Sequence, residues 1–135
     1  MKISPILIAL VLCLSCISCK YVYGPRQEVK DFIDAKEAVI LDIGKKVEAD
    51  PTLNGVEAAR KIFEERKGKL QDKLNSIRQA PQGINADWLT MLLNSKASDS
   101  KYFEMIRMQL IQKMADPITL DQFSALENSF ETELK

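Results

Sequence analysis

The chain has 135 residues, with 19 basic and 19 acidic side chains, three cysteines and no histidine. This length suits one small domain with a single modest core. The balanced charge gives no support for nucleic-acid binding, which normally needs a basic face, and the lack of histidine excludes imidazole-based catalytic triads and histidine-bearing zinc sites. We therefore expect no nucleic-acid partner and no cofactor.

The N-terminal segment has the pattern of a secretory signal peptide. Lys2 is followed by an almost unbroken apolar run from Ile3 to Leu14, and then by small residues and cysteines up to Cys19. A short positive start, an apolar stretch of about a dozen residues and a small residue before the cleavage point are typical of such peptides. The stretch from Ile3 to Ser18 is shorter than the roughly 20 residues that span a bilayer. We therefore expect it to be cleaved off rather than kept as an anchor.

Two cysteines at the end of this segment each follow a small residue, in Ser15-Cys16 and Ser18-Cys19. In this feature the segment resembles the signal peptides of bacterial lipoproteins. In that class the cysteine is modified with fatty acids such as palmitate and becomes the new N-terminus. Three residues before the modified cysteine the class usually has leucine, whereas this chain has Cys16 or Cys13. We favour Cys19 as the lipidated residue, because the apolar run continues through Ile17, and Cys16 remains the alternative.

The expected organisation has three parts. Residues 1–18 are the lipoprotein signal peptide, residues 19–26 a lipidated tether, and residues 27–135 a single helical domain. Fully extended, the tether reaches about 25 Å, so the domain should sit close to the membrane. The resemblance implies a lipid-anchored membrane protein of the cell envelope. Lys20, directly after the modified cysteine, implies the outer membrane where the source has one.

Apolar residues at helical spacing predict five helical segments and no sheet. The segments are 27–49, 54–79, 84–94, 100–115 and 119–134, with a polar connection at 95–101. Proline follows the first, second and fourth segments and disfavours helix at the residue before it. A capping-box pattern, Thr119 with Gln122 three residues later, marks the start of the last segment. The expected fold is all-α, a compact bundle of four to five helices.

The third and fourth segments carry more apolar side chains than one core face requires. The surplus residues that we expect to form a binding surface are Trp88, Met91, Leu92, Met105, Met108 and Ile111. One interpretation is that both segments lie centrally and bury two faces each. The other is a hydrophobic groove for a partner helix or an acyl chain, a role that suits the flexible thioether of methionine.

Few patterns in the chain point to a reaction. Ser98-Asp99-Ser100-Lys101 fits the S-x-x-K motif of penicillin-binding enzymes, but the accompanying S-D-N and K-T-G elements are absent from the sequence. Carboxylate pairs such as Asp31 and Asp34 lack the further oxygen ligands that a metal would need. We therefore expect no metal site and no enzyme activity. The expected function is a non-catalytic adaptor for another envelope protein, with a lipid- or hydrophobe-binding module as the alternative.

Overall fold

The computed structural model describes residues 22–134, and this part of the chain contains four α-helices and no strand. The helices are α2 (Arg26–Ala49), α3 (Leu53–Gln79), α4 (Asp87–Gln112) and α5 (Pro117–Glu133). The expected all-α bundle is therefore confirmed. The predicted signal peptide and both candidate lipidation sites, Cys16 and Cys19, lie outside the described residues.

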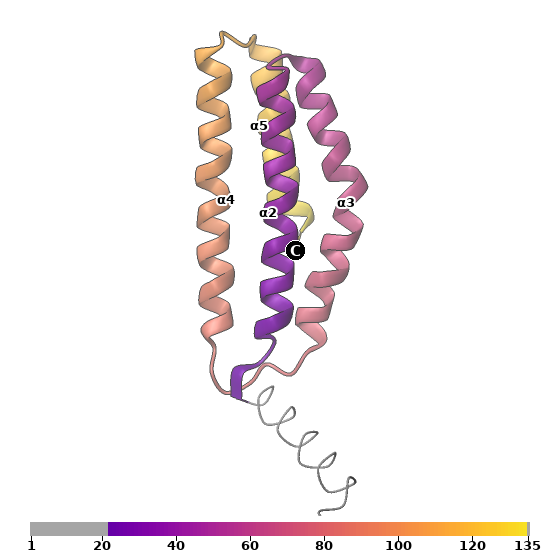
Figure 1. Ribbon diagram of the computed structural model, residues 1–135, viewed down its shortest axis with the longest axis vertical. Coiled ribbons are helices and arrows are strands. Elements are labelled where there is room, and N and C mark those ends of the chain that lie inside the picture. Colours follow the sequence, from indigo (N-terminus) through magenta and orange to yellow (C-terminus); the bar gives the residue numbers. More distant parts are fainter. Residues whose placement is uncertain (1–21, 135) are drawn as a thin grey trace, which may run out of the picture.

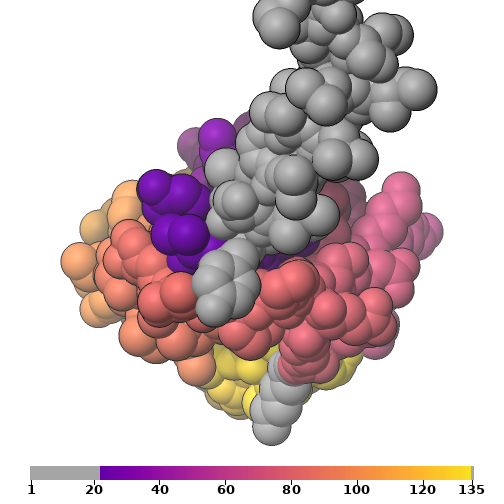
Figure 2. All heavy atoms as spheres, turned by 90° about the horizontal axis from the view of Figure 1, so that it is seen from below, coloured from indigo at the N-terminus to yellow at the C-terminus, as the bar shows by residue number. Residues whose placement is uncertain are grey.

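The four helices run alternately up and down the long axis of the bundle (Figure 1). Contacts join α2 to α3, α2 to α4, α3 to α5 and α4 to α5. The helices α3 and α4 follow each other in the chain but occupy opposite corners. Their connection must therefore cross one end of the bundle, and Figure 2 shows this end from below, with the connection running from α3 towards α4.

Phenylalanine rings from three helices form the centre of the core. The ring centroids of Phe63 and Phe130 are 5.2 Å apart. Phe103 lies 5.5 Å from Phe130 and 6.0 Å from Phe123. Tilted and edge-on ring pairs at such distances add to the free energy gained from burial alone. This cluster ties α5 to both α3 and α4, although α5 is the shortest of the four helices.

The predicted break between the third and fourth helical segments is wrong. Residues 95–101 are helical and form the middle of α4, so the two segments are one helix of 26 residues. The segment contains neither glycine nor proline to stop a helix. Part of its polar character comes from residues that face inwards, because Ser95 is buried and Asp99 pairs across the bundle with Lys36 of α2. The other residues of the segment are exposed and form the water-facing side of a continuous helix.

The last helix begins earlier than the capping-box pattern predicted. Asp116 is the N-cap residue, and its side chain accepts the backbone N–H of Thr119 at 2.7 Å. Pro117 occupies the first helical position, where its missing N–H costs no hydrogen bond. Thr119 is therefore already inside α5, and its side chain is buried. The Asp-Pro pair starts this helix instead of only ending the preceding one.

The connection between α3 and α4 is fixed to the residues that precede α2. The backbone N–H of Asn85 donates to the carbonyl oxygen of Val22 at 2.8 Å. Gly24 and Gly83 both have positive φ, and a Cβ on Gly24 would lie 2.2 Å from the Gln82 carbonyl oxygen. The two segments can approach this closely only because these positions are glycine. We call this part of the molecule, residues 22–25 with residues 82–85, the tether end.

Candidate functional site

The structure divides the predicted binding residues into two groups along α4. Trp88 is buried, and its indole Nε1–H donates to the Gln82 carbonyl oxygen at 3.0 Å. Met91 and Leu92 are half-buried and pack against the core. Trp88 and Leu92 thus belong to the packing of the first turns of α4, and Met91 is partly accessible beside them.

Met105, Met108 and Ile111 are exposed on the second half of α4. Their exposed fractions are 58%, 50% and 48%. Met114 and Ile118, in and after the turn that leads to α5, are exposed at 90% and 64%. We call these five residues the upper apolar patch. It lies towards the end of the bundle opposite the tether end, because α4 begins at the tether end and runs away from it (Figure 1).

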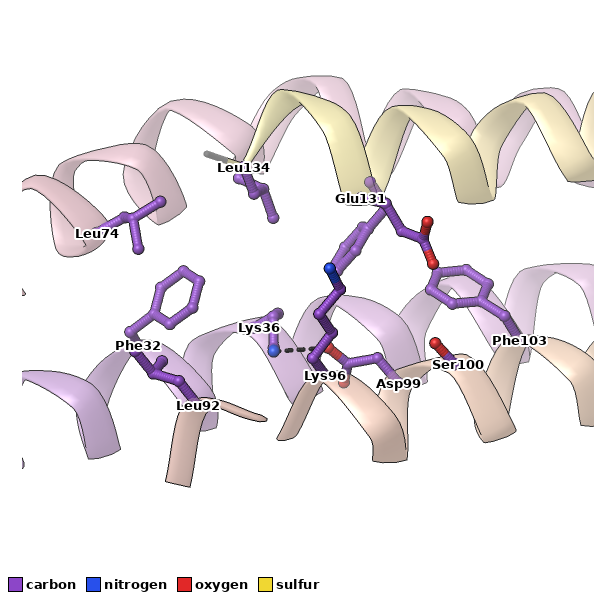
Figure 3. Close-up of a pocket in the computed structure, with 11 residues that line it drawn as sticks. Phe32, Lys36, Leu74, Leu92, Lys96, Asp99, Ser100, Phe103, Glu131 and Leu134 are labelled. Atoms are coloured by element: carbon purple, nitrogen blue, oxygen red, sulfur yellow. Dashed lines mark ion pairs between the residues drawn. The ribbon is translucent and has the colours of Figure 1, made fainter. Parts of the chain in front are cut away.

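A separate hollow lies where α5 stops short of the other helices. The chain reaches its C-terminal end about halfway along the bundle, so only α2, α3 and α4 continue towards the tether end (Figure 1). The hollow has a volume of about 180 Å³. Phe32, Leu74, Leu92 and Leu134 contribute apolar side chains to its lining, and Figure 3 shows them gathered on one side of the hollow, from α2, α3, α4 and the end of α5.

A buried ion pair forms the polar part of this hollow. Lys36 Nζ lies 2.6 Å from a carboxylate oxygen of Asp99 and 5.4 Å from the centroid of the Phe32 ring. Burial raises the pKa of Asp99, and the hydrogen bond and charge of Lys36 act in the opposite direction. Figure 3 shows Lys36 and Asp99 pointing towards each other from α2 and α4. The pair leaves the hollow close to neutral.

The hollow is small for a ligand site. Binding pockets for small molecules usually occupy about 300 Å³ or more, and this hollow could take only a short apolar group. The four residues Trp88, Met91, Met105 and Met108 do not line it. Met91 and Met105 instead border two other hollows, at different places along α4.

We looked among the described residues for a metal-ligand cluster and for a catalytic setting of the S-x-x-K pattern. Within residues 22–134, no three potential metal ligands of the histidine, cysteine or carboxylate kind come together. Ser98 and Lys101 of the S-x-x-K pattern are both exposed in the middle of α4. Asp99, which lies between them in the sequence, points to Lys36 instead, so the pattern combines an exposed helix face with a buried ion pair.

The position of Lys36 in the sequence was a clue to the Lys36–Asp99 pair, but helical periodicity alone did not identify the partner. Lys36 falls on the apolar stripe of the first predicted helix, where we expected its head group to reach water. The structure buries that head group instead. A lysine whose head group is buried needs an acidic partner close by. Asp99 is that partner, although the pattern placed it in a connection.

The chain was compared with protein families, curated proteins and solved structures. No family model, curated protein or solved structure matches the chain. Among the described helices none has both the length and the apolar character needed to cross a bilayer.

Proposed function

We propose that this protein is a lipid-anchored adaptor of the bacterial cell envelope, and that its upper apolar patch docks a helix of another envelope protein. The observation that carries the docking proposal is the exposure of Met105, Met108 and Ile111 on the outer side of α4. The lipoprotein-type segment ending at Cys19 supports the anchoring.

The geometry of the patch favours a helical partner. Met105, Met108 and Ile111 follow each other at intervals of three residues, so their side chains form a row along α4. A helix laid beside α4 can place apolar side chains against such a row at its own three- and four-residue spacing. The methionines can adjust their conformations to the shape of the partner.

The alternative function, binding of a lipid or another hydrophobe, is supported by a different feature. The hollow below α5 has an apolar lining that includes Phe32, Leu74 and Leu134. Its volume of about 180 Å³ limits such a ligand to a short apolar segment. The adaptor proposal is preferred because the side chains of the patch are exposed to solvent, whereas the hollow is small.

Site-specific photocrosslinking in isolated envelopes tests the adaptor proposal. A photoreactive amino acid replaces Met108 in one protein and Lys61, which is exposed on α3, in a control. We expect a crosslinked product from position 108 and none from position 61. Mapping of the crosslinked peptide should place it in an apolar helix of a different envelope protein.

A charge substitution completes this test. Met108→Glu adds a carboxylate at a half-exposed position, so the fold should be retained while the crosslink from a probe at the neighbouring Met105 is lost. A product of twice the chain's own mass would identify a second copy as the occupant and contradict the adaptor proposal. Equal crosslinking from positions 108 and 61 would also contradict it.

A further inference from the structure

The tether end carries exposed apolar side chains of its own. Val22 and Tyr23 are exposed at 40% and 47%, and Ile84 in the connection between α3 and α4 is exposed at 71%. These residues come from segments about 60 positions apart in the chain, yet the hydrogen bond from Asn85 to Val22 holds them side by side. They are thus part of one surface, at the end where the chain leads back to Cys19.

The tether end is a rigid part of the domain. Gly24 and Gly83 bring two backbones into close contact, and Gly24 and Pro25 are both buried. Trp88 adds a hydrogen bond from the first turn of α4 to Gln82. Val22, the first residue that the structure describes, is therefore fixed relative to the helices. Anything that limits where Val22 can lie therefore also limits how the whole bundle is oriented.

The length of chain between this surface and the anchor determines what lies next to it. Only three peptide units separate Cys19 from Val22, which gives a span of at most about 11 Å. If Cys19 carries the lipid, as the proposed function requires, the tether end must lie at the level of the lipid headgroups. Tyrosine is enriched at this level, because its ring is apolar and its hydroxyl is polar.

The charges near this surface are compatible with a lipid headgroup. A hollow of about 450 Å³ at this end is bordered by Tyr23, Arg26, Lys30 and Met91, and also by Glu28. Arg26 and Lys30 are exposed, and neither forms an ion pair with another described residue. Cationic side chains beside apolar ones can contact the phosphate group of a phospholipid and the first part of its acyl chains.

We infer that the tether end is a second membrane contact, in which Val22, Tyr23 and Ile84 enter the interfacial layer of the bilayer that holds the lipidated Cys19. This contact sets the long axis of the bundle steeply to the membrane. Met105 stands 18 residues after the start of α4, or about 27 Å along the helix axis. The upper apolar patch is then presented well above the headgroups, so its partner is an extramembrane segment and not a membrane-spanning one.

Single fluorescent labels on the lipidated protein in phosphatidylethanolamine–phosphatidylglycerol vesicles test this inference. Processing at Cys19 leaves no other free thiol in the mature chain, so an introduced cysteine is labelled alone. Ile84→Cys places the label at the tether end. Ile118→Cys is the matched control, since it replaces an isoleucine of similar exposure, 64%, at the other end of the bundle.

We expect quenchers carried on lipid chains to quench the label at position 84 several-fold more strongly than the label at position 118. A second protein combines Ile118→Cys with Tyr23→Ser and Ile84→Ser. In it, energy transfer from position 118 to acceptors on the headgroups should increase, because the bundle is no longer held upright. Equal quenching at positions 84 and 118 would overturn the inference.

Flotation of the same vesicles separates this result from a failure of the anchor. Protein that floats with the vesicles but is equally quenched at both positions retains the proposed anchoring and loses only the second contact. Protein that does not float contradicts the anchoring and, with it, the second contact.

Discussion

At the scale of single residues, Trp88 shows how an apparent binding residue is part of the core. Its ring is buried and its Nε1–H reaches the Gln82 carbonyl oxygen, so it joins α4 to the connection before it. Trp88→Ala should lower the free energy of unfolding by about 3–5 kcal/mol, the usual cost of truncating a buried tryptophan. Denaturant-induced unfolding followed by circular dichroism measures this loss. Leu93→Ala, at a position that is 69% exposed, should change the free energy by less than about 0.5 kcal/mol.

The Lys36–Asp99 pair should respond asymmetrically to substitution. Lys36→Met leaves the buried Asp99 carboxylate without its partner and should cost about 3 kcal/mol at neutral pH. Burial raises the folded-state pKa of Asp99 above its ordinary value of 3.8. The ionised carboxylate therefore destabilises the fold once the pH rises above that folded-state pKa, and the destabilisation disappears when a lower pH protonates the carboxylate. The deficit of Lys36→Met relative to wild type should therefore shrink towards pH about 4.

The double variant Lys36→Met/Asp99→Leu is the control for this interpretation. Replacing both charges with apolar side chains removes the unpaired carboxylate, so the free energy of unfolding should return to within about 1 kcal/mol of wild type. A double variant as unstable as Lys36→Met alone would show that packing of the lysine stem, and not the ion pair, determines stability here.

At the scale of the elements, periodicity predicted the helices whose polar residues face water. The segments 27–49 and 54–79 agree closely with α2 and α3, because in both the apolar stripe is continuous enough to define the element. Residues 95–101 differ, since Ser95 and Asp99 are polar residues that face inwards. The environment of Asp99 depends on Lys36, 63 positions earlier in the chain, and local pattern contains no information on such a partner.

Glycine substitution tests whether α4 is continuous. Ala97 is exposed in the middle of the helix, so Ala97→Gly should cost about 1 kcal/mol, from the difference in helix propensity alone. Ala86 is the N-cap residue of α4, where glycine is at least as favourable as alanine, and Ala86→Gly should leave stability nearly unchanged. Thermal or denaturant unfolding measures both. An Ala97→Gly protein as stable as wild type would instead indicate a flexible connection at this point.

At the scale of the whole molecule, the candidate site could be predicted only in part. The sequence showed that α4 carries surplus apolar residues, but it did not show which of them other helices cover. That depends on the connection crossing the tether end, which places α4 between α2 and α5. Trp88 is buried and Leu92 packs against the core, whereas Met108 and Ile111 are about half exposed. The close approach of the two segments at this crossing needs Gly24 and Gly83, which are far apart in the sequence and adjacent in the structure.

The anchor determines whether the bundle works at a membrane at all, and both cysteines must be replaced to test it. A single acyl chain gives marginal, reversible membrane binding, whereas several chains on one cysteine hold a protein firmly. The Cys16→Ala/Cys19→Ala protein should therefore keep its helical circular dichroism spectrum but leave the membrane fraction. In wild type, intact-mass measurement should show loss of residues 1–18 and a gain of fatty acids, both blocked by an inhibitor of lipoprotein signal processing. If only Cys16→Ala abolishes the acylated mass, the alternative cysteine is the modified one. A double variant that stays membrane-bound at its full unprocessed mass would show that the N-terminal segment itself holds the protein, and lipid anchoring would be wrong.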